Sequence, residues 1–387
     1  MSSVALGELV EIRGGGTPDK KVPDYWDGDI PWASVKDFKS TSLASTIDRI
    51  TQAGVANSAT QVIPAGNIIV PTRMAVGKAA INEIDLAINQ DLKALIPSQR
   101  IDRQYLLHAL LANAKTLEDQ ATGATVKGIK LDALRSLQIP LPPLQEQRRI
   151  AGILDQADAL RRFRTRALDK LGTLGQAIFH EMFGASSPDH AAWEKINLSE
   201  LVLPDDRINY GVVQPGPHDP EGVPIIRVAD LASPVVAFDS IKRIAPSIDA
   251  EYGRSRLKGG EVLIGCVGSI GTTIIAPPEF AGANVARAVA RVPLDTSRCE
   301  PRFVAEQLRS QRIQNYFTKE VRLVAQPTLN IKQIRETEII LPPKELQVSF
   351  VERVHEIEAQ KAQHAAALTA CDVLFASLQS TAFRGEV

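Results

Sequence analysis

The sequence predicts an α+β protein built as an internal repeat, with two mixed α/β domains separated by two long helices that pack as an antiparallel coiled coil. Three observations predict this pseudo-two-fold plan. The string Leu-Pro-Pro occurs at 141–143 and again at 341–343. No proline follows it from 144 to 183 or from 344 to 383. The segments that precede the two strings share short motifs with each other.

An apolar stripe predicts that each proline-free stretch is one long helix. Apolar residues recur at alternating gaps of three and four, the pattern of a helix that packs lengthwise on another helix. The proposed pairing residues are Ile153, Ala157, Leu160, Leu171, Leu174 and Ile178 in the first copy, and Phe350, Val354, Ile357, Leu368, Cys371, Phe375 and Leu378 in the second. Arg164, Lys361 and His364 interrupt the stripes.

The two stretches also match at their ends, which argues against two unrelated surface helices. Pro142 and Pro143 correspond to Pro342 and Pro343, Gln147 to Gln347, Leu174 to Leu374, and Phe183 to Phe383. Proline fits the first turn of a helix because its missing N–H is not needed there. A helix of this length would be about 60 Å long.

The segments ahead of the helices predict two related domains. Leu198-Ser-Glu-Leu-Val202 echoes Leu6-Gly-Glu-Leu-Val10, and Gly260-Glu-Val-Leu-Ile264 echoes Gly66-Asn-Ile-Ile-Val70. Gly271 also falls where Gly77 does. The predicted boundaries are 1–140, 141–184, 185–340 and 341–387. Other stretches diverge freely, so the two copies carry the different surface chemistry expected of two related recognition tasks.

Short segments within the first copy predict a compact mixed domain. A turn is expected at Gly14-Gly-Gly-Thr17-Pro18, and Val62–Val70 reads as strand, turn and strand. Further strands are expected at Ala79–Ile84, Leu92–Ile96 and Leu137–Leu141, with a helix at Tyr105–Leu117 and a polar, flexible segment at Ala121–Lys130.

Composition narrows the class of protein. The 387 residues have a net charge of −1, which argues against a uniformly basic nucleic-acid binder but leaves room for a local basic groove. No apolar run is expected to span a bilayer. Cys266, Cys299 and Cys371 form an odd, scattered set that suits a reducing cytoplasm and builds neither a disulfide framework nor a zinc site.

Catalytic motifs are missing from the sequence. It has no Gly-x-x-x-x-Gly-Lys-Ser/Thr loop for a nucleoside triphosphate and no Asn-Pro-Pro-aromatic motif of an amino-methyltransferase. Gly265–Gly271 is glycine-rich but reads as a turn beside a strand. The six histidines show no metal-ligand spacing. The chain is therefore expected to be a binding protein that is not an enzyme and holds no metal.

Three strings carry a family resemblance over essentially the whole chain. They are Gly14-Gly-Gly-Thr17-Pro18, then Tyr25-Trp26-x-Gly28-Asp29-Ile30-Pro31-Trp32, and Leu141-Pro-Pro-Leu144-Gln-Glu-Gln147-Arg-Arg-Ile150. Together they resemble the DNA specificity subunit of type I restriction–modification systems. The second helix departs from the family string at Pro343-Lys-Glu-Leu-Gln347 and keeps its length and final glutamine.

The resemblance implies a function and a set of partners. Each domain would be a target-recognition domain that reads one half of a split site in double-stranded DNA. Two methyltransferase subunits, which bring S-adenosylmethionine, would dock on the helices, and restriction/translocase subunits would join for cleavage. The chain itself would bind no cofactor and no membrane, and it would act in a prokaryotic cytoplasm. A helix of about 60 Å exceeds one duplex turn of about 34–36 Å, so helix length would set the unread gap.

Candidate DNA contacts are side chains that bind phosphates or base edges and that cluster in loops. In the first domain they are Thr17, Lys20, Lys21, Lys36, Arg73, Lys78, Lys127 and Lys130. In the second they are Arg227, Lys242, Arg254, Arg256, Lys258, Arg322, Gln326 and Asn330. For any one of these residues, ordinary surface exposure is an equally good interpretation.

Two further surfaces lie on the helices. Apolar residues beside the stripe are assigned to methyltransferase docking, with burial against the chain's own domains as the alternative; they are Ile150, Leu154, Leu168, Phe179 and Met182. The basic run Arg161, Arg162, Arg164 and Arg166 is expected to be solvated or to pair with acids such as Glu352, Glu356 and Glu358, and a contact with the DNA spacer is the minor alternative.

Other functional classes stay open from the sequence. The chain could be an assembly scaffold whose two domains bind protein, or the recognition subunit of a different phage-defence system. A stand-alone methyltransferase or nuclease is a third class, which turnover by the purified chain would reveal.

Overall fold

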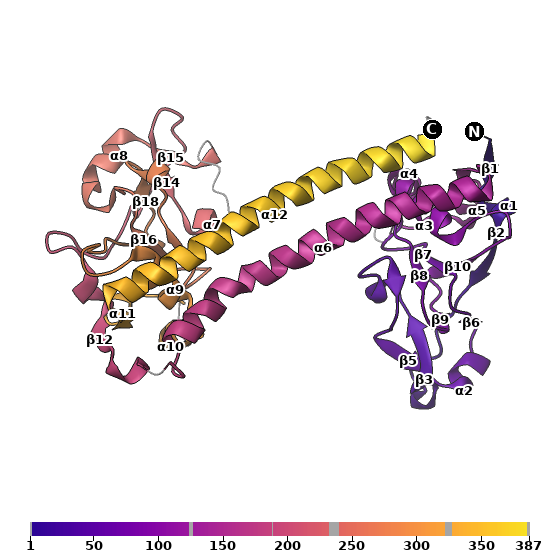
Figure 1. The fold of residues 1–387 in the computed structure, drawn as a ribbon, viewed down its shortest axis with the longest axis horizontal. Coiled ribbons are helices and arrows are strands. Elements are labelled where there is room, and N and C mark those ends of the chain that lie inside the picture. Colours follow the sequence, from indigo (N-terminus) through magenta and orange to yellow (C-terminus); the bar gives the residue numbers. More distant parts are fainter. Residues whose placement is uncertain (1, 124–126, 188, 232–239, 322–326, 385–387) are drawn as a thin grey trace. The chain divides into compact units, whose positions relative to one another are not determined.

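The computed structural model describes residues 2–123, 127–187, 189–231, 240–321 and 327–384 (Figure 1). The chain divides into two compact units. Unit 1 comprises Met1–Arg166 and Ala365–Val387, and unit 2 comprises Ala167–His364. Each unit therefore contains a mixed α/β module together with one part of each long helix, and each is described by itself.

Unit 1 is a mixed α/β module with three sheets. Its strands are β1 (Ser3–Ala5), β2 (Val10–Gly14), β3 (Trp26–Ala33), β4 (Ser42–Leu43), β5 (Asp48–Ile50), β6 (Val62–Ile63), β7 (Ile68–Pro71), β8 (Ala80–Asn82), β9 (Leu86–Ile88), β10 (Leu92–Pro97) and β11 (Gln138–Pro140). Its short helices are α1 (Leu6–Leu9), α2 (Gln52–Ala56), α3 (Arg103–Ala112), α4 (Ala114–Asp119) and α5 (Leu131–Arg135), with 3-10 turns at Pro23–Tyr25 and Val35–Asp37. The sheet orders are β2-β10-β7-β8-β4, β5-β3-β9-β6 and β1-β11.

Unit 2 follows the same plan. Its strands are β12 (Glu194–Asn197), β13 (Asn209–Tyr210), β14 (Val223–Ile226), β15 (Arg243–Ile244), β16 (Val262–Gly265), β17 (Thr273–Ile275), β18 (Asn284–Val285), β19 (Val289–Val292) and β20 (Glu338–Leu341). Its helices are α7 (Val228–Leu231), α8 (Pro246–Glu251), α9 (Pro301–Arg309), α10 (Gln311–Val321) and α11 (Ile331–Arg335), with 3-10 turns at His190–Ala192, Leu198–Leu201, Gly253–Ser255 and Pro278–Phe280. The sheet orders are β13-β19-β16-β17, β15-β14-β18 and β12-β20.

The strand registers of the two units agree, so that single residues of unit 1 can be matched to single residues of unit 2. In unit 1, β7 pairs with β10 so that Ile69 faces Ala94. In unit 2, β16 pairs with β19 so that Leu263 faces Arg291. Because Gly66–Val70 corresponds to Gly260–Ile264, Arg291 occupies the position of Ala94. The side-chain period of two keeps both residues on the same face of their sheets.

Two long helices complete the units. Helix α6 spans Leu144–Phe183 and helix α12 spans Lys344–Arg384 (Figure 1). In unit 1, Arg161 of α6 donates to Asp372 of α12 at 2.6 Å and stacks over the Phe375 ring. In unit 2, Phe179 of α6 packs against Phe350 at the start of α12, with ring centroids 5.6 Å apart. The early part of each helix thus meets the late part of the other, so the pairing is antiparallel.

The residues of the two predicted stripes are only partly buried. Phe350, Val354 and Ile357 are buried. Partly buried members are Ala157, Leu171, Ile178, Leu368, Cys371, Phe375 and Leu378. Ile153, Leu160 and Leu174 are each more than one-third exposed, so the prediction that these three face the helix partner does not match their exposure.

The assignment of Ile150, Leu154 and Phe179 to partner docking is wrong, because the alternative holds and the chain's own cores bury them. Ile150 and Leu154 lie in one cluster with Leu106 and Leu110 of α3, where the first turns of α6 pack on unit 1. Phe179 lies in the core of unit 2. Of the other two proposed docking residues, Leu168 is partly buried and Met182 packs against that second core.

The basic run of α6 finds partners other than those expected. Besides Asp372, Arg161 meets Asp158 at 3.3 Å, and Arg162 meets Asp158 at 3.2 Å. Glu358 pairs with Arg302 of α9 at 2.6 Å instead. Arg161 therefore joins α6 to α12, whereas Arg162 forms an ion pair within α6.

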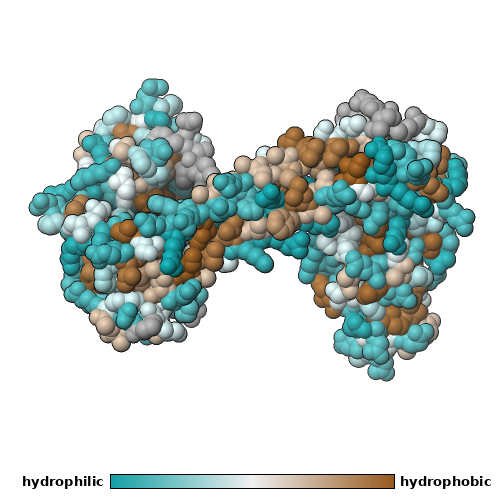
Figure 2. All heavy atoms as spheres, viewed as in Figure 1, coloured by the Kyte–Doolittle hydropathy of each residue, from teal (hydrophilic) through white to brown (hydrophobic). Residues whose placement is uncertain are grey.

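Helix α12 is long and apolar enough to cross a membrane by length and composition alone, which by itself is weak evidence for a membrane span. The expectation that no stretch reaches this length is wrong by that criterion, because alanines raise the mean hydropathy without a continuous run of large apolar residues. Little of this stretch is buried. Figure 2 shows hydrophobic residues gathered along the part of α12 nearest the C-terminus.

Candidate nucleic-acid interface

A pair of adjacent loops carries cationic side chains in unit 1. The segment after β7 runs beside the segment before α5, because Arg73 forms a bridge with Gly128 and the Ile129 amide donates to the Thr72 carbonyl at 2.9 Å. The Met74 amide donates to the Lys127 carbonyl at 3.1 Å. Arg73 and Lys127, which lie far apart in sequence, are therefore neighbours on an exposed edge.

A turn at Asn89–Asp91 gathers more polar groups beside these loops. The Thr17 hydroxyl donates to the Gln90 side chain. The Lys93 ammonium donates to the Gln90 carbonyl at 3.1 Å, and Arg73 lies 3.8 Å from the Asp91 carboxylate. Burial lowers the pKa of Lys93 from its ordinary value, against a smaller opposing effect of Asp91. The sequence interpretation missed Lys93 because it stands in an apolar strand.

Glycines are required where the Gly14–Thr17 loop enters this region. A Cβ on Gly15 would overlap the carbonyl oxygen of Ile88, and one on Gly16 would overlap the backbone at Thr60. The Trp32 indole donates to the Gly16 carbonyl at 3.1 Å and packs edge-on to Trp26. The two tryptophans of the family string thus fasten the loop that presents Thr17.

The remaining candidates of unit 1 are exposed but lie in separate places. Lys20 and Lys21 stand on the loop before the first 3-10 turn, and Lys36 lies in the second. The Lys78 ammonium donates to the Phe38 carbonyl at 3.1 Å, close to the turn that carries Lys36. Lys130 is the residue before α5.

Unit 2 repeats the loop pair with different chemistry. Val267 bridges Thr328, and the Leu329 amide donates to the Cys266 carbonyl at 2.9 Å. Val267 therefore stands where unit 1 has Arg73. The next position is Gly268 in unit 2, with a φ of 73°, and Met74 in unit 1, with a φ of 65°. Met74 keeps a left-handed backbone that favours glycine, and its side chain is 61% exposed.

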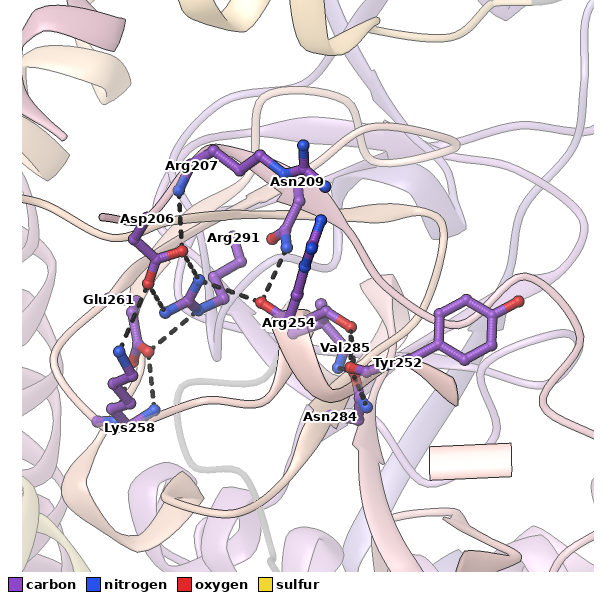
Figure 3. A network of polar contacts seen from close by, with 12 residues as sticks. Asp206, Arg207, Asn209, Tyr252, Arg254, Lys258, Glu261, Asn284, Val285 and Arg291 are labelled. Carbon is purple, nitrogen blue, oxygen red and sulfur yellow. Dashed lines mark hydrogen bonds and ion pairs between the residues drawn. The ribbon is translucent and has the colours of Figure 1, made fainter. Parts of the chain in front are cut away.

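A basic pocket of about 530 Å³ lies elsewhere on unit 2. It brings together three predicted residues, Arg254, Arg256 and Lys258, which follow one another along the loop between α8 and β16. Figure 3 shows Arg254 and Lys258 of this loop together with Arg291. Among the described residues, five cationic and two anionic side chains line the pocket, the others being Asp205, Asp206, Arg207 and Arg291.

A buried arginine forms the floor of the pocket. The Arg291 side chain is 1% exposed and donates to both Asp206 oxygens, at 2.9 and 2.8 Å, and to Glu261 at 3.2 Å (Figure 3). The hydrogen bonds from Arg291 lower the pKa of Asp206 to about 2, against an opposing effect of burial. Burial disfavours the charged guanidinium, yet the two carboxylates outweigh this and raise the pKa of Arg291. A buried charge of this kind persists only when paired.

Backbone groups of the loop between α8 and β16 form hydrogen bonds with Arg291 and with its partner Glu261. The Arg254 carbonyl accepts from Arg291 at 3.4 Å and from Asn209 at 2.9 Å. The Glu261 carboxylate accepts the amides of Lys258 and Gly259 at 2.7 and 2.9 Å. The loop is therefore held at both ends while the Arg254 and Lys258 side chains remain exposed.

A second buried network holds the middle of that loop. Asp249 accepts from Asn284 at 2.9 Å and pairs with Arg256. The Ser255 hydroxyl donates to Asn284 at 2.6 Å, and Asn284 donates to the Tyr252 carbonyl at 3.2 Å. Arg256 is thus engaged with Asp249, whereas the guanidinium groups of Arg254 and Arg207 have no polar partner within the described residues.

Other candidates of unit 2 are dispersed. Arg227 pairs with Asp230 at 3.1 Å, and Lys242 donates to the Gly216 carbonyl. Asn330 caps helix α11, and its backbone amide donates to the Gln333 side-chain oxygen at 2.8 Å, as in a capping box. Arg322 and Gln326 lie outside the described residues.

Sequence reasoning missed Arg207, Asp206 and Arg291. Arg291 sits in a strand of otherwise apolar residues, and an isolated charge at such a place is the one available signal. Its partner Asp206 is 85 positions away. In the described ranges, no cluster of three or more His, Cys, Asp or Glu side chains is arranged to hold a metal ion.

Comparisons with known proteins agree with this architecture. The family model for the type I restriction modification DNA specificity domain matches residues 1–171 and 204–369. The chain is 28% identical over 361 residues to the type I restriction enzyme EcoBI specificity subunit of Escherichia coli, covering 84% of this chain and 76% of that protein. It is 38% identical over 162 residues to the EcoR124I/EcoR124II specificity subunit of Escherichia coli, covering 40% of each.

Solved structures show the same fold. The type I restriction–modification S subunit from M. genitalium superposes with a TM-score of 0.60 at 16% identity, over 99% of this chain and 96% of that one. A chain from a study of complex assembly and conformational transition of the type I R-M system superposes with a TM-score of 0.62 at 21% identity, over 100% and 98%. Because the family model covers both copies of the repeat, the chain belongs to the type I restriction–modification DNA specificity family.

Proposed function

We propose that this chain is the non-catalytic subunit that gives a type I restriction–modification complex its DNA sequence specificity. Each unit would read one half of a bipartite duplex site, and the length of α6 and α12 would set the unread gap. S-adenosylmethionine would be brought by the methyltransferase partners, and the complex would act in the cytoplasm.

One observation carries the proposal: equivalent loop positions in the two units carry different side chains, although the backbone around them is the same. Arg73 and Met74 stand where Val267 and Gly268 stand in the other copy. Loops are where a rigid scaffold places binding residues, and bases are read by side chains that differ in donors, acceptors and apolar groups. Two scaffolds with the same backbone and different loops suit two different half-sites.

A surface on the long helices supports partner docking. Leu160, Phe163, Val373 and Leu374 are 43%, 56%, 68% and 52% exposed. The contacts of Arg161 with Asp372 and Phe375 place the two helix segments that carry these residues side by side. These four residues, called the helix patch, replace the buried residues first assigned to the methyltransferase, because exposed apolar residues near one another mark a partner site.

Sequencing of methylated positions tests the function. Cells that carry this chain with its methyltransferase partner are expected to methylate one bipartite motif, and exchange of residues 1–140 for those of a relative should change one half only. A purified complex without salt-sensitive DNA affinity would favour the assembly scaffold. Turnover by the chain alone with S-adenosylmethionine and Mg²⁺ would favour an enzyme.

Capture experiments test the helix patch. Phe163→Ser and Val373→Ser each are expected to weaken retention of the methyltransferase subunit on the tagged chain, because they place a hydroxyl where an apolar contact is needed. Ala366→Ser is the matched control, since it changes an exposed residue of the same helix. Retention that is equal for all three variants would remove the patch from the interface.

A further inference from the structure

We infer that the basic pocket of unit 2 is a binding site for a phosphodiester of the DNA backbone, built by an insertion that unit 1 lacks. The inference rests on the proposed function and adds to it one site, one ligand class and two residues, Arg207 and Arg254. It also assigns the buried Arg291 as the positioning residue of that site.

The insertion is visible in the strand registers. In unit 1, Val10 pairs with Pro97 and Arg13 with Ala94, so residues 11–12 lie between the two pairs. In unit 2, Val202 pairs with Leu294 and Asn209 with Arg291, so residues 203–208 lie between them. Both partner strands supply two residues, 95–96 and 292–293. Unit 2 therefore carries four additional residues, six minus two, in a strand-edge loop.

The added loop and the buried arginine belong together. Asp206 on the loop forms the paired hydrogen bonds with Arg291, which stands at the position of the buried Ala94. Paired hydrogen bonds between a guanidinium and a carboxylate fix orientation as well as distance. The pair therefore pins the loop, and with it Arg207, opposite the loop that carries Arg254 (Figure 3).

The charges of the pocket favour an anion. Asp206, Glu261 and Asp249 are engaged with Arg291, Lys258 and Arg256. Arg207 and Arg254 are exposed, and among the described residues their guanidinium groups have no carboxylate partner. Asp205 is the remaining acid of the lining. The backbones that carry Arg207 and Arg254 are already held, so binding has to order the two side chains but not their loops, and this lowers the cost of association.

The lining also selects the kind of anion. Among the residues that the structure describes, it contains Pro204 and Gly253 but no aromatic side chain. A nucleotide base that leaves the duplex is ordinarily held by stacking on an aromatic ring or in an apolar slot, and the described lining offers neither. An open, polar, cationic site instead suits a backbone phosphate, which positions a protein on the duplex without reading sequence.

Salt dependence of duplex binding by the chain assembled with its methyltransferase partner tests the inference. Arg207→Gln and Arg254→Gln are each expected to reduce the slope of log K against log salt by about 0.9, and the double variant by about twice that. The loss should be equal on cognate and unrelated duplexes. Lys195→Gln is the control, since it removes an exposed cation of the same unit on β12, outside the pocket.

Each outcome decides between explanations. Unchanged slopes for both variants would overturn the inference, and so would a loss confined to the cognate duplex, which indicates base reading. Stabilisation of the wild-type chain by inorganic phosphate, absent in the variants and accompanied by unchanged DNA slopes, would also overturn it in favour of a free-anion site. Failure of the wild-type complex to bind any duplex would instead contradict the proposed function. Equal melting temperatures would show that the variants fold.

Discussion

Gln147 and Gln347 make the same pair of hydrogen bonds at the starts of α6 and α12. The side-chain oxygen of Gln147 accepts from the Asp102 amide at 2.8 Å, and that of Gln347 accepts from the Glu300 amide at 2.9 Å. Their nitrogens donate to the carbonyls of Pro142 and Pro342, at 2.8 and 2.9 Å. Each glutamine thereby ties the start of a long helix to the N-cap residue of a shorter helix in its own unit, Asp102 of α3 and Glu300 of α9.

Loss of either glutamine side chain should destabilise its unit. Gln147→Ala leaves the buried carbonyl of Pro142 and the Asp102 amide unpaired, which costs about 1–3 kcal/mol in free energy of unfolding. Chemical denaturation measures the effect. Gln145→Ala is the control because Gln145 is exposed two residues away. Equal unfolding free energies for the two variants would contradict this role.

Relief of backbone strain at Met74 should stabilise unit 1. Met74→Gly removes the penalty of a side chain in the left-handed region and is expected to raise the free energy of unfolding by about 1 kcal/mol. Gly268→Ala introduces the same penalty in unit 2 and is expected to lower it by about as much. Thermal and chemical denaturation report both.

A matched substitution separates strain from side-chain loss at this position. Met74→Ala keeps the Cβ and hence the strained backbone, so its stability should stay near that of the wild type. If Met74→Ala stabilises the protein as much as Met74→Gly does, exposure of the thioether rather than φ is the cause.

The Asp206–Arg291 pair should make unit 2 sensitive to acid. The folded pKa of Asp206, about 2, lies below its ordinary value of 3.8. The pair therefore contributes its full stability above about pH 4, and this contribution is lost as the pH falls through about 2. The difference in unfolding free energy between wild type and Asp206→Asn should be largest near neutral pH and shrink over that window.

A neighbouring acid provides the control for the acid titration. Asp205→Asn removes an exposed carboxylate of the same loop and leaves the Arg291 contacts in place. The unfolding free energies are measured by urea denaturation at a series of pH values. If the difference between the wild type and Asp206→Asn does not change with pH, the ionisation of Asp206 is not linked to stability.

The three cysteines should differ in reactivity. Burial raises the pKa of both Cys266 and Cys299 to about 12, so almost no thiolate forms at pH 8. Cys371 on α12 is partly exposed. Mass spectrometry after iodoacetamide treatment is expected to find the label on Cys371 in the native chain and on all three after denaturation. Early labelling of Cys266 would show that its strand opens readily.

Much of the fold follows from sequence patterns that depend on nearby residues. The two helices are predicted within 141–184 and 341–387 and span Leu144–Phe183 and Lys344–Arg384. A proline doublet marks the start of each, and the proline-free stretch that follows predicts its length. The predicted helix at Tyr105–Leu117 is in fact α3 and α4, which break at Asn113. Its side chain bonds the Ala109 carbonyl and ends the first helix locally.

Other features depend on residues that are distant in the chain. Val62–Val70 is a strand, a turn and a strand as predicted. The two strands belong to different sheets, however, because β6 pairs with β9 and β7 pairs with β10. The pocket needs Asp206, Glu261 and Arg291 at once, and no local pattern links them. Loop candidates such as Arg254 could be found because charge in a loop is visible locally.

The division of the chain into units has a consequence for its synthesis. The core of unit 1 includes Ala382, and the Phe383 ring packs 5.3 Å from that of Tyr105. Unit 2 comprises one continuous stretch, Ala167–His364. The ribosome therefore synthesises all of unit 2 before it adds Ala365–Val387, which complete the core of unit 1. Unit 1, whose synthesis begins before that of unit 2, is thus completed after it. A stop codon within the stretch that encodes Ala365–Val387 would then damage the module that is encoded ahead of unit 2.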